Sequence, residues 1–428
     1  MLSNASEASS LPSVDKRPSF PPAMLASLRP MNGVSGYIGP AQSVEPEESR
    51  PAVVSLFSGG GGLDLGLELA GFSTRAAVEI EPYACETLKR NREARIELGG
   101  GARYLEDAEI VECDVTRLSG AELLRKAQLR RGEATLLAGG PPCITFSVAG
   151  RRAGLSHETG RLFEEYVRLL RVIRPAALIY ENVKGLMSAV DEEGTPGGAF
   201  RRIHDSIEAE GYALSYKVVN MADYGIPQFR ERVIIIGRRG RRPFEFPEPT
   251  HRDFERPLPA GEDGNREPWR DVQWALEGLP DAAPPGTREP PIPNHVARRH
   301  SPQVVRSFAA TRPGKRNKRF KRDRLRWERP SKVIRAQGKA KPDGSGQKNS
   351  SHQALHPDRA RQLTPRECAR IQTFPDWYWL PSQFVNSYRI VGDAVPPAFA
   401  QLVGESIADQ LGLAEACSSE AALLASAA

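Results

Sequence analysis

The 428-residue sequence predicts an α/β domain whose central sheet is mostly parallel. Short apolar runs alternate with helical patterns between about residues 51 and 244. Several of these runs end in glycines or in a carboxylate, as in LFSGGGG, AAVEIE and ATLLAGGPP. This alternation favours parallel strands joined by crossover helices, and ligands bind beyond the carboxyl ends of such strands.

The expected strands are apolar runs of four to eight residues that are bounded by glycine or polar residues. They are AVVSLF (52–57), RAAVEI (75–80), ATLLAGG (134–140), AALIYEN (176–182), LSYKVVN (214–220) and RVIIIG (232–237). A further candidate strand ends at Asp114 in VECDVT. Apolar residues at helical spacing predict helices that begin near Leu63 and near Leu162.

Helical signals return near the carboxyl end of the chain. Thr364 and Glu367 form a capping box, and Pro365 occupies the first helical position. A last amphipathic helix is expected over residues 399–411. These signals indicate that the ordered part of the chain extends to about residue 413.

Composition divides the chain into unequal parts. Residues 1–50 are rich in Ser, Pro, Ala and Glu, which predicts a disordered leader, and residues 414–428 are expected to form a tail. Residues 51–244, completed by 385–413, are the predicted catalytic and cofactor-binding domain. Residues 245–384 are the predicted small domain. Within them, the Pro-, Gly- and Arg-rich stretch from about 245 to 350 is either that second domain or a long disordered insert.

Charge and cysteine content restrict the class of protein. Lys and Arg total 59 against 53 Asp and Glu, and the stretch 312–332 is strongly basic and contains Phe320 and Trp327. Basic residues interleaved with aromatics favour nucleic acid as a partner, and the alternative is a solvated basic loop. Five widely spaced cysteines without a C-x-x-C pair argue against a disulfide framework and against a zinc site. We therefore expect no metal, no membrane segment and a cytoplasmic location.

The first expected strand is followed by the glycine-rich segment SGGGG. Glycines between a strand and a helix allow a ligand to approach the backbone and the helix N-terminus closely. The next strands end in Glu79 and Asp114, where carboxylates accept hydrogen bonds from a nucleoside. This order predicts a nucleoside-containing cofactor, and the alternative is a glycine turn with two surface acids.

Cys143 follows a strand end and two prolines, in GGPPC. A thiol held rigidly beside a cofactor site is a candidate nucleophile, whereas the commoner fate of a lone cysteine is burial as an inert thiol. The next strand carries Glu181 to the same edge of the sheet. Arg230 and Arg232 alternate in an extended segment, where paired guanidinium groups bind phosphates or developing negative charge, unless they belong to a solvated surface hairpin.

These residues, taken in order, resemble the DNA (cytosine-5) methyltransferase family. The matching blocks are FSGGGG, EIEPYACETLKRN, CDV, GGPPC, ENV, QFRER, LTPRECARIQTFPD and GDAVPP. They cover roughly residues 52–242 and 327–413. The resemblance implies a Rossmann-like S-adenosylmethionine-dependent methyltransferase domain, a smaller irregular target-recognition domain between about 245 and 350, and a specific double-stranded DNA sequence as the substrate.

The resemblance also implies the residues that bind S-adenosyl-L-methionine. Glu79 would hold the ribose, Asp114 and Val115 the adenine, and Ile80 would pack on the adenine ring. The full set expected at the cofactor site is Phe57, Ser58, Gly59, Gly61, Glu79, Ile80, Asp114, Val115, Pro142, Asp393 and Val395.

In this family the catalytic cysteine adds to carbon 6 of a cytosine that has been flipped out of the duplex. By resemblance, Cys143 supplies that thiolate and Glu181 donates a proton or a hydrogen bond to ring nitrogen 3. Asn182 would orient that carboxyl or the loop around the cysteine. Arg232 would contact the extruded base, and Arg230 the nearby DNA backbone.

Two positions depart from the family pattern. Ile144-Thr145 replaces the usual Gln-Gly after the cysteine, and Asp393 stands where relatives usually have Asn. The alternatives to a DNA enzyme are an RNA (tRNA) cytosine-5 methyltransferase and a catalytically silent DNA-binding module. We expect a monomer, and a cognate restriction endonuclease that acts on the same site is a candidate partner.

Overall fold

The computed structural model describes residues 50–99, 101–142, 162–257, 265–336 and 353–413. The nucleophile candidate Cys143, the neighbouring Ile144-Thr145, residues 1–49 of the predicted leader and the predicted tail 414–428 lie outside the described residues. No helix in these described ranges has the length and apolar character that a membrane span requires.

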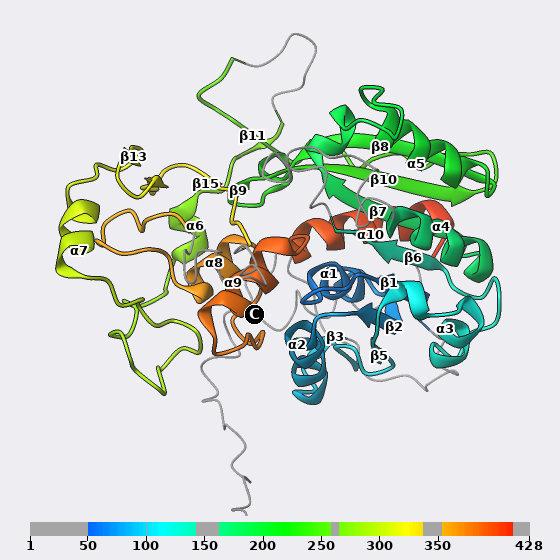
Figure 1. The fold of residues 1–428 in the computed structure, drawn as a ribbon, viewed down its shortest axis with the longest axis horizontal. Helices are drawn as coiled ribbons and strands as arrows, with labels where there is room; N and C mark the ends of the chain where they lie inside the picture. Colours follow the sequence, from blue (N-terminus) through cyan, green and yellow to red (C-terminus); the bar gives the residue numbers. More distant parts are fainter. Residues whose placement is uncertain (1–49, 100, 143–161, 258–264, 337–352, 414–428) are drawn as a thin grey trace, which may run out of the picture.

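A seven-stranded sheet forms the centre of the larger part of the molecule, with the strand order β5-β2-β1-β6-β7-β10-β8 (Figure 1). All neighbouring pairs from β5 to β7 are parallel, and β10 runs antiparallel to both β7 and β8. The mostly parallel sheet predicted from the sequence is therefore confirmed. The strands are β1 (Ala52–Leu56), β2 (Ser73–Glu79), β5 (Glu109–Glu112), β6 (Leu136–Gly139), β7 (Ala177–Val183), β8 (Tyr212–Asn220) and β10 (Glu231–Arg239).

The order of the strands creates a switch point beside β1. From β1 the chain proceeds outward through β2 to β5, and it then returns to the other side of β1 to form β6 and β7. Because crossover connections leave β1 in opposite directions, the carboxyl ends of β1 and β6 form a topological switch point, where ligands bind in sheets of this kind. The glycine-rich segment after β1 and the Gly-Pro-Pro segment after β6 both begin at this switch point.

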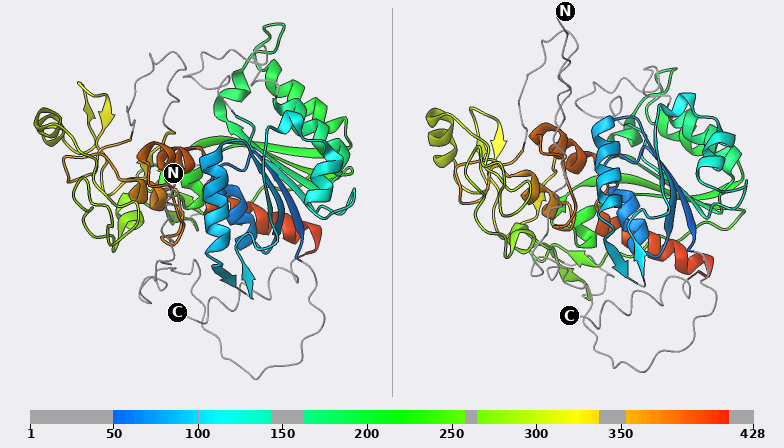
Figure 2. Two further views of the ribbon diagram at one scale, coloured as in Figure 1. Left: turned by 60° about the horizontal axis from the view of Figure 1, so that its bottom comes forward. Right: turned by 90° about the horizontal axis from the view of Figure 1, so that it is seen from below.

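Helices cover both faces of the sheet (Figure 2). On one face, α3 (Gly120–Lys126), α4 (Leu162–Ile173) and α5 (Gly198–Glu208) bury apolar side chains against every second residue of the strands. On the other face, α1 (Gly62–Leu69) and α10 (Pro397–Leu411) pack against the alternate residues. Successive side chains of each strand point to opposite faces and enter two separate cores, which is why these strands are apolar throughout.

A third core joins α1 and α2, at the β5-β2-β1 side of the sheet, to the later part of the chain. It contains Leu65 of α1, Cys85 and Leu88 of α2 (Pro82–Glu93), and buried residues of α8 (Pro365–Ile371) and α9 (Phe384–Asp393). The predicted capping box is present, since Thr364 and Glu367 cap each other's backbone N–H groups at the start of α8. Residues on both sides of residue 384 share this core, and the domain boundary predicted there stays a prediction.

The described residues between 245 and 350 are ordered in short elements that lie beside α8 and α9 (Figure 1). Val272, Leu276, Phe308 and Leu325 are buried, so these residues are packed, and Val272, Leu276 and Leu325 belong to the core shared with α8 and α9. The elements are β11 (His251–Arg252), β12 (Glu267–Pro268), α6 (Val272–Leu276), α7 (Pro302–Ala309), β13 (Arg316–Asn317), β14 (Arg322–Asp323) and β15 (Ser331–Lys332). The remaining short strands are β3 (Glu97–Gly99), β4 (Ala102–Arg103) and β9 (Gln228–Phe229).

Candidate active site

The segment after β1 has the backbone conformation that a close ligand approach needs. Phe57, Gly59 and Gly61 all have positive φ angles, of 56°, 55° and 72°, and Gly61 is the N-cap of α1. A Cβ atom added to Gly59 would meet no atom within 4 Å, so the backbone of this loop borders open space. The loop therefore presents bare backbone at the N-terminus of α1, next to the switch point.

Glu79, at the carboxyl end of β2, ties this loop to the neighbouring strand. Its carboxylate accepts hydrogen bonds from the backbone N–H groups of Gly59 (2.7 Å), Ile80 (2.8 Å) and Glu81 (2.8 Å). The Ile80 side chain is 56% exposed although it is apolar. An exposed apolar side chain beside a bound carboxylate suits the stacking surface predicted for a purine ring.

Asp114 lies on the same edge of the sheet, two residues after β5. One of its carboxylate oxygens accepts hydrogen bonds from the N–H (2.9 Å) and the hydroxyl (2.8 Å) of Thr116. These hydrogen bonds hold the pKa of Asp114 below its usual range. Its other oxygen accepts no hydrogen bond from the described residues, and it remains available to a ligand. Val115, which follows it, is buried.

The segment that leads to Cys143 is held against the end of β7. Asn182 is 1% exposed, and its amide donates a hydrogen bond to the carbonyl of Pro141 at 3.2 Å. Its side-chain oxygen accepts from the N–H of Val183 at 2.9 Å. A Cβ atom on Gly140 would lie 2.8 Å from a carboxylate oxygen of Glu181. Glycine at this position therefore lets the Gly-Pro-Pro segment, which ends in the half-buried Pro142, pass close to Glu181.

Glu181 and Arg232 form an ion pair at the same edge. The Arg232 Nε atom lies 2.8 Å from a Glu181 oxygen, and the two side chains are only 14% and 12% exposed. Arg232 also donates a hydrogen bond to the carbonyl of Glu231 at 2.8 Å. The pair places a guanidinium and a carboxylate together, which suits recognition of a polar ring by both a donor and an acceptor.

Arg230 lies elsewhere than the sequence predicted. Its side chain is 1% exposed, and its guanidinium donates to the carbonyls of Gly392 (3.1 Å) and Ala394 (2.8 Å). It therefore clamps the segment before α10, and it is not at a surface that the DNA backbone could reach. Residues 392–394, which are distant in sequence, cover this side of the strand, so the Arg230 side chain is buried although its segment is extended.

The segment held by Arg230 borders the glycine-rich loop. A Cβ atom on Gly62 would overlap the carbonyl of Val395, so this segment lies directly on the start of α1. Burial raises the pKa of Asp393, while the guanidinium groups of Arg230 and Arg232 act in the opposite direction. Asp393 thus lies within the electrostatic influence of the Glu181–Arg232 pair as well as near the loop.

Three buried polar residues at this edge were missed by sequence reasoning. Tyr104 and Tyr378 donate hydrogen bonds to the carbonyls of Gly61 and Gly60, respectively. Asp64, in α1, is fully buried, and among the described residues neither of its oxygens has a hydrogen bond of good geometry. Its only sequence signal is a carboxylate inside the apolar helical segment GLDLGL.

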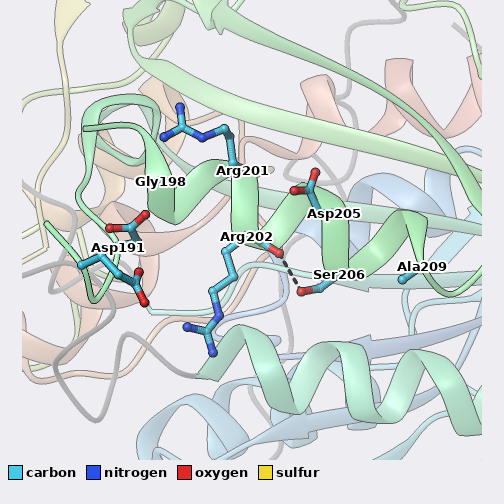
Figure 3. A pocket seen from close by; sticks show the side chains of 8 residues that line it. Asp191, Gly198, Arg201, Arg202, Asp205, Ser206 and Ala209 are labelled. Atoms are coloured by element: carbon cyan, nitrogen blue, oxygen red, sulfur yellow. Dashed lines mark hydrogen bonds between the residues drawn. The ribbon is translucent and has the colours of Figure 1, made fainter. Parts of the chain in front are cut away.

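Two hollows differ in their relation to these residues. One, of about 640 Å³, opens beside Arg232 and is also lined by Lys184, Phe229, Arg256 and Trp269. The other, of about 570 Å³, lies on α5 and the loop before it (Figure 3). There the Ser206 hydroxyl donates a hydrogen bond to the carbonyl of Arg202. The second hollow contains none of the predicted site residues, so the first is the candidate substrate cleft.

The fold and the site are those of a Rossmann-like methyltransferase, with a glycine-rich loop after β1, carboxylates at or just after the ends of β2 and β5, and a carboxylate–guanidinium pair at the end of β7. The family model for C-5 cytosine-specific DNA methylase matches residues 52–409. The chain belongs to this family, and it is a DNA cytosine-5 methyltransferase.

Individual relatives agree with this assignment. Type II methyltransferase M1.HphI of Haemophilus parahaemolyticus is 31% identical over 368 residues, which cover 83% of this chain and 86% of that protein. Type II methyltransferase M.XorII of Xanthomonas oryzae is 31% identical over 383 residues, which cover 84% and 85%. Among solved structures, S. pombe Dnmt2 methyltransferase has the same fold, with a TM-score of 0.53 and 16% identity over 85% of this chain and 99% of that chain.

Proposed function

We propose that the protein transfers a methyl group from S-adenosyl-L-methionine to carbon 5 of a flipped-out cytosine in a specific duplex DNA sequence, through a covalent bond between Cys143 and carbon 6. The observation that carries this proposal is the Glu181–Arg232 pair at the end of β7. The hydrogen bond from Asn182 to Pro141 holds the chain that leads to Cys143 next to that pair.

The proposed chemistry follows from the weak reactivity of carbon 5. The Cys143 thiolate adds to carbon 6, and the ring's electron pair moves toward nitrogen 3, where Glu181 in its protonated form donates a proton or a hydrogen bond. Arg232 orients the Glu181 carboxyl and contacts the base. Carbon 5, now nucleophilic, would take the methyl group from the sulfonium of S-adenosylmethionine, and S-adenosylhomocysteine would leave. A base then removes the carbon-5 proton, the proton at nitrogen 3 returns to Glu181, and the carbon–sulfur bond breaks to restore the thiolate.

The residues near the glycine-rich loop fit S-adenosylmethionine, because the loop borders open space at Gly59 and an apolar surface at Ile80. When bound, this cofactor supplies an electrophilic methyl group on sulfur. We propose that Asp114 and Val115 contact the adenine and that Glu79 contacts the ribose. The other residues proposed to line the site are Phe57, Ser58, Gly61, Pro142, Asp393 and Val395.

Duplex DNA is the proposed substrate, and the cleft beside Arg232 is the proposed entry for the flipped nucleotide. Trp269 and Phe229 offer aromatic surfaces there, and Arg256 and Lys184 offer positive charge. The basic stretch 312–332 would bind phosphates, and side chains near it would read base edges in the major groove. The names of the relatives support a role in a restriction-modification system, with an endonuclease for the same site as a partner.

The test is trapping of the covalent intermediate. Bisulfite sequencing of DNA from cells that express the protein identifies the target, and a duplex with 5-fluorocytosine at that site should then give an adduct that survives denaturation. Cys143→Ala should abolish both the adduct and methyl transfer while it leaves cofactor affinity nearly unchanged. Cys113→Ala, at a half-buried cysteine near the cofactor edge, is the matched control.

Methyl transfer by Cys143→Ala at the wild-type rate would refute the covalent route. Preferential methylation of tRNA over duplex DNA in a competition assay would instead refute the proposed substrate.

A further inference from the structure

Two tyrosine hydroxyls support the glycine-rich loop from its buried side. Tyr104 donates to the carbonyl of Gly61 at 3.2 Å, and Tyr378 donates to the carbonyl of Gly60. The two hydroxyl oxygens lie 3.3 Å apart, and both side chains are fully buried. Any Cβ atom on Gly61 would overlap both hydroxyls. The loop backbone therefore rests directly on this hydroxyl pair.

Tyr378 is connected to the insert, residues 245–350, through hydrogen bonds of the buried Arg366 and of Asn294. The guanidinium of Arg366, which is 1% exposed, donates to the carbonyl of Tyr378 at 3.0 Å and to the carbonyl of Pro293 at 3.1 Å. Asn294, also in the insert, donates from its side-chain amide to the carbonyl of Pro381 at 2.8 Å. The segment that carries Tyr378 is thus held on one side by the insert and on the other by the loop.

We infer that Tyr378 is a positioning residue for cofactor binding, an inference that rests on the proposed cofactor site. Through Tyr378, the way the insert packs against residues 378–381 affects the backbone conformation of the glycine-rich loop. The loop has left-handed conformations at Gly59 and Gly61, and the carbonyls between and after them are those that the tyrosines bind. Each of these carbonyls shares a rigid peptide plane with the next N–H group. Tyr378 therefore fixes the Gly60–Gly61 plane, whose N–H donates to the carbonyl of Ser58 at 2.9 Å and closes the turn that contains Gly59. The hydroxyl of Tyr378 thereby affects the cofactor without touching it.

The first test compares two buried tyrosines. Tyr378→Phe removes the hydroxyl that binds the loop. Tyr388→Phe removes an equally buried hydroxyl, which donates to the carbonyl of Leu363 at 2.6 Å in the same core. Affinity for S-adenosylhomocysteine is measured by calorimetry on the full chain, and stability is measured by urea unfolding. We expect Tyr378→Phe to weaken the affinity about three- to tenfold, and Tyr388→Phe to leave it unchanged, at similar losses of stability.

The second test is a double-mutant cycle with the insert. Asn294 has a φ of 63°, so Asn294→Gly removes its amide without backbone strain. This variant should weaken S-adenosylhomocysteine binding about twofold in the wild-type background and have no further effect in the Tyr378→Phe background.

Equal affinities of Tyr378→Phe, Tyr388→Phe and wild type would overturn the positioning role, and independent effects of Asn294→Gly would overturn the transmission. If the wild-type protein itself failed to bind S-adenosylhomocysteine, the proposed function would fail instead.

Discussion

Replacing the buried carboxyl of Asp64 should stabilise the protein at neutral and alkaline pH. Asp64 lies in α1 beneath the glycine-rich loop, and its side chain is fully buried. Burial raises its pKa from 3.8 to about 6, and the nearby Ser55 hydroxyl only partly opposes this effect. Asparagine has the shape of a neutral carboxyl group and cannot ionise, so Asp64→Asn removes the buried charge while it preserves the volume.

The direction of the effect follows from proton linkage. Above pH 3.8 the unfolded chain releases the Asp64 proton while the folded protein retains it, so the free energy of unfolding falls as the pH rises. The loss is complete once the pH exceeds the folded pKa of about 6. It amounts to about 3 kcal/mol in total, of which about half develops between pH 5 and pH 8.

The assay is urea unfolding of wild type and Asp64→Asn at pH 5, 7 and 8. We expect the stability difference to shift in favour of Asp64→Asn by about 1.4 kcal/mol between pH 5 and pH 8. Burial also raises the pKa of Glu68, to about 7, but this residue contributes equally to both proteins. Asp281→Asn is the control, because Arg359 lowers the pKa of this exposed carboxyl from 3.8, so it stays ionised in both states and the profiles of wild type and Asp281→Asn should run parallel between pH 5 and pH 8. Parallel pH profiles of wild type and Asp64→Asn would refute the reasoning.

Three further predictions concern the candidate active site. Gly140→Ala should lower kcat about 10- to 100-fold with little loss of stability, because the new Cβ atom would displace the carboxylate at the end of the flexible Glu181 side chain. Steady-state kinetics at unchanged cofactor affinity test this. Asn182→Ala should destabilise the protein by about 1–3 kcal/mol and slow turnover, since the carbonyl of Pro141 loses its buried donor, and a wild-type rate would contradict the anchoring role. Arg230→Met should destabilise the protein by about 3–5 kcal/mol, as judged by urea unfolding, and a selective loss of DNA affinity in a variant of wild-type stability would instead favour a phosphate contact.

The sequence alone determined the local elements and the edge of the sheet at which the candidate site lies. Continuous apolar runs identified the strands, which are buried on both faces, and the capping box at Thr364 identified the start of α8. Because parallel strands share the direction of their carboxyl ends, residues that follow different strands, such as Glu79, Asp114 and Glu181, could be assigned to one edge. These inferences depend only on neighbours within one turn or one strand.

Only the tertiary structure decided how distant segments close around that edge. Arg230 and Arg232 are two residues apart and look equivalent in sequence, yet one clamps the carbonyls of residues 392 and 394 and the other pairs with Glu181. Tyr104 and Tyr378 meet across 274 positions of sequence. Such contacts depend on which chain segments pack together, and local periodicity contains no information about that choice. The physical reason is that burial and hydrogen-bond partners are properties of the assembled cores.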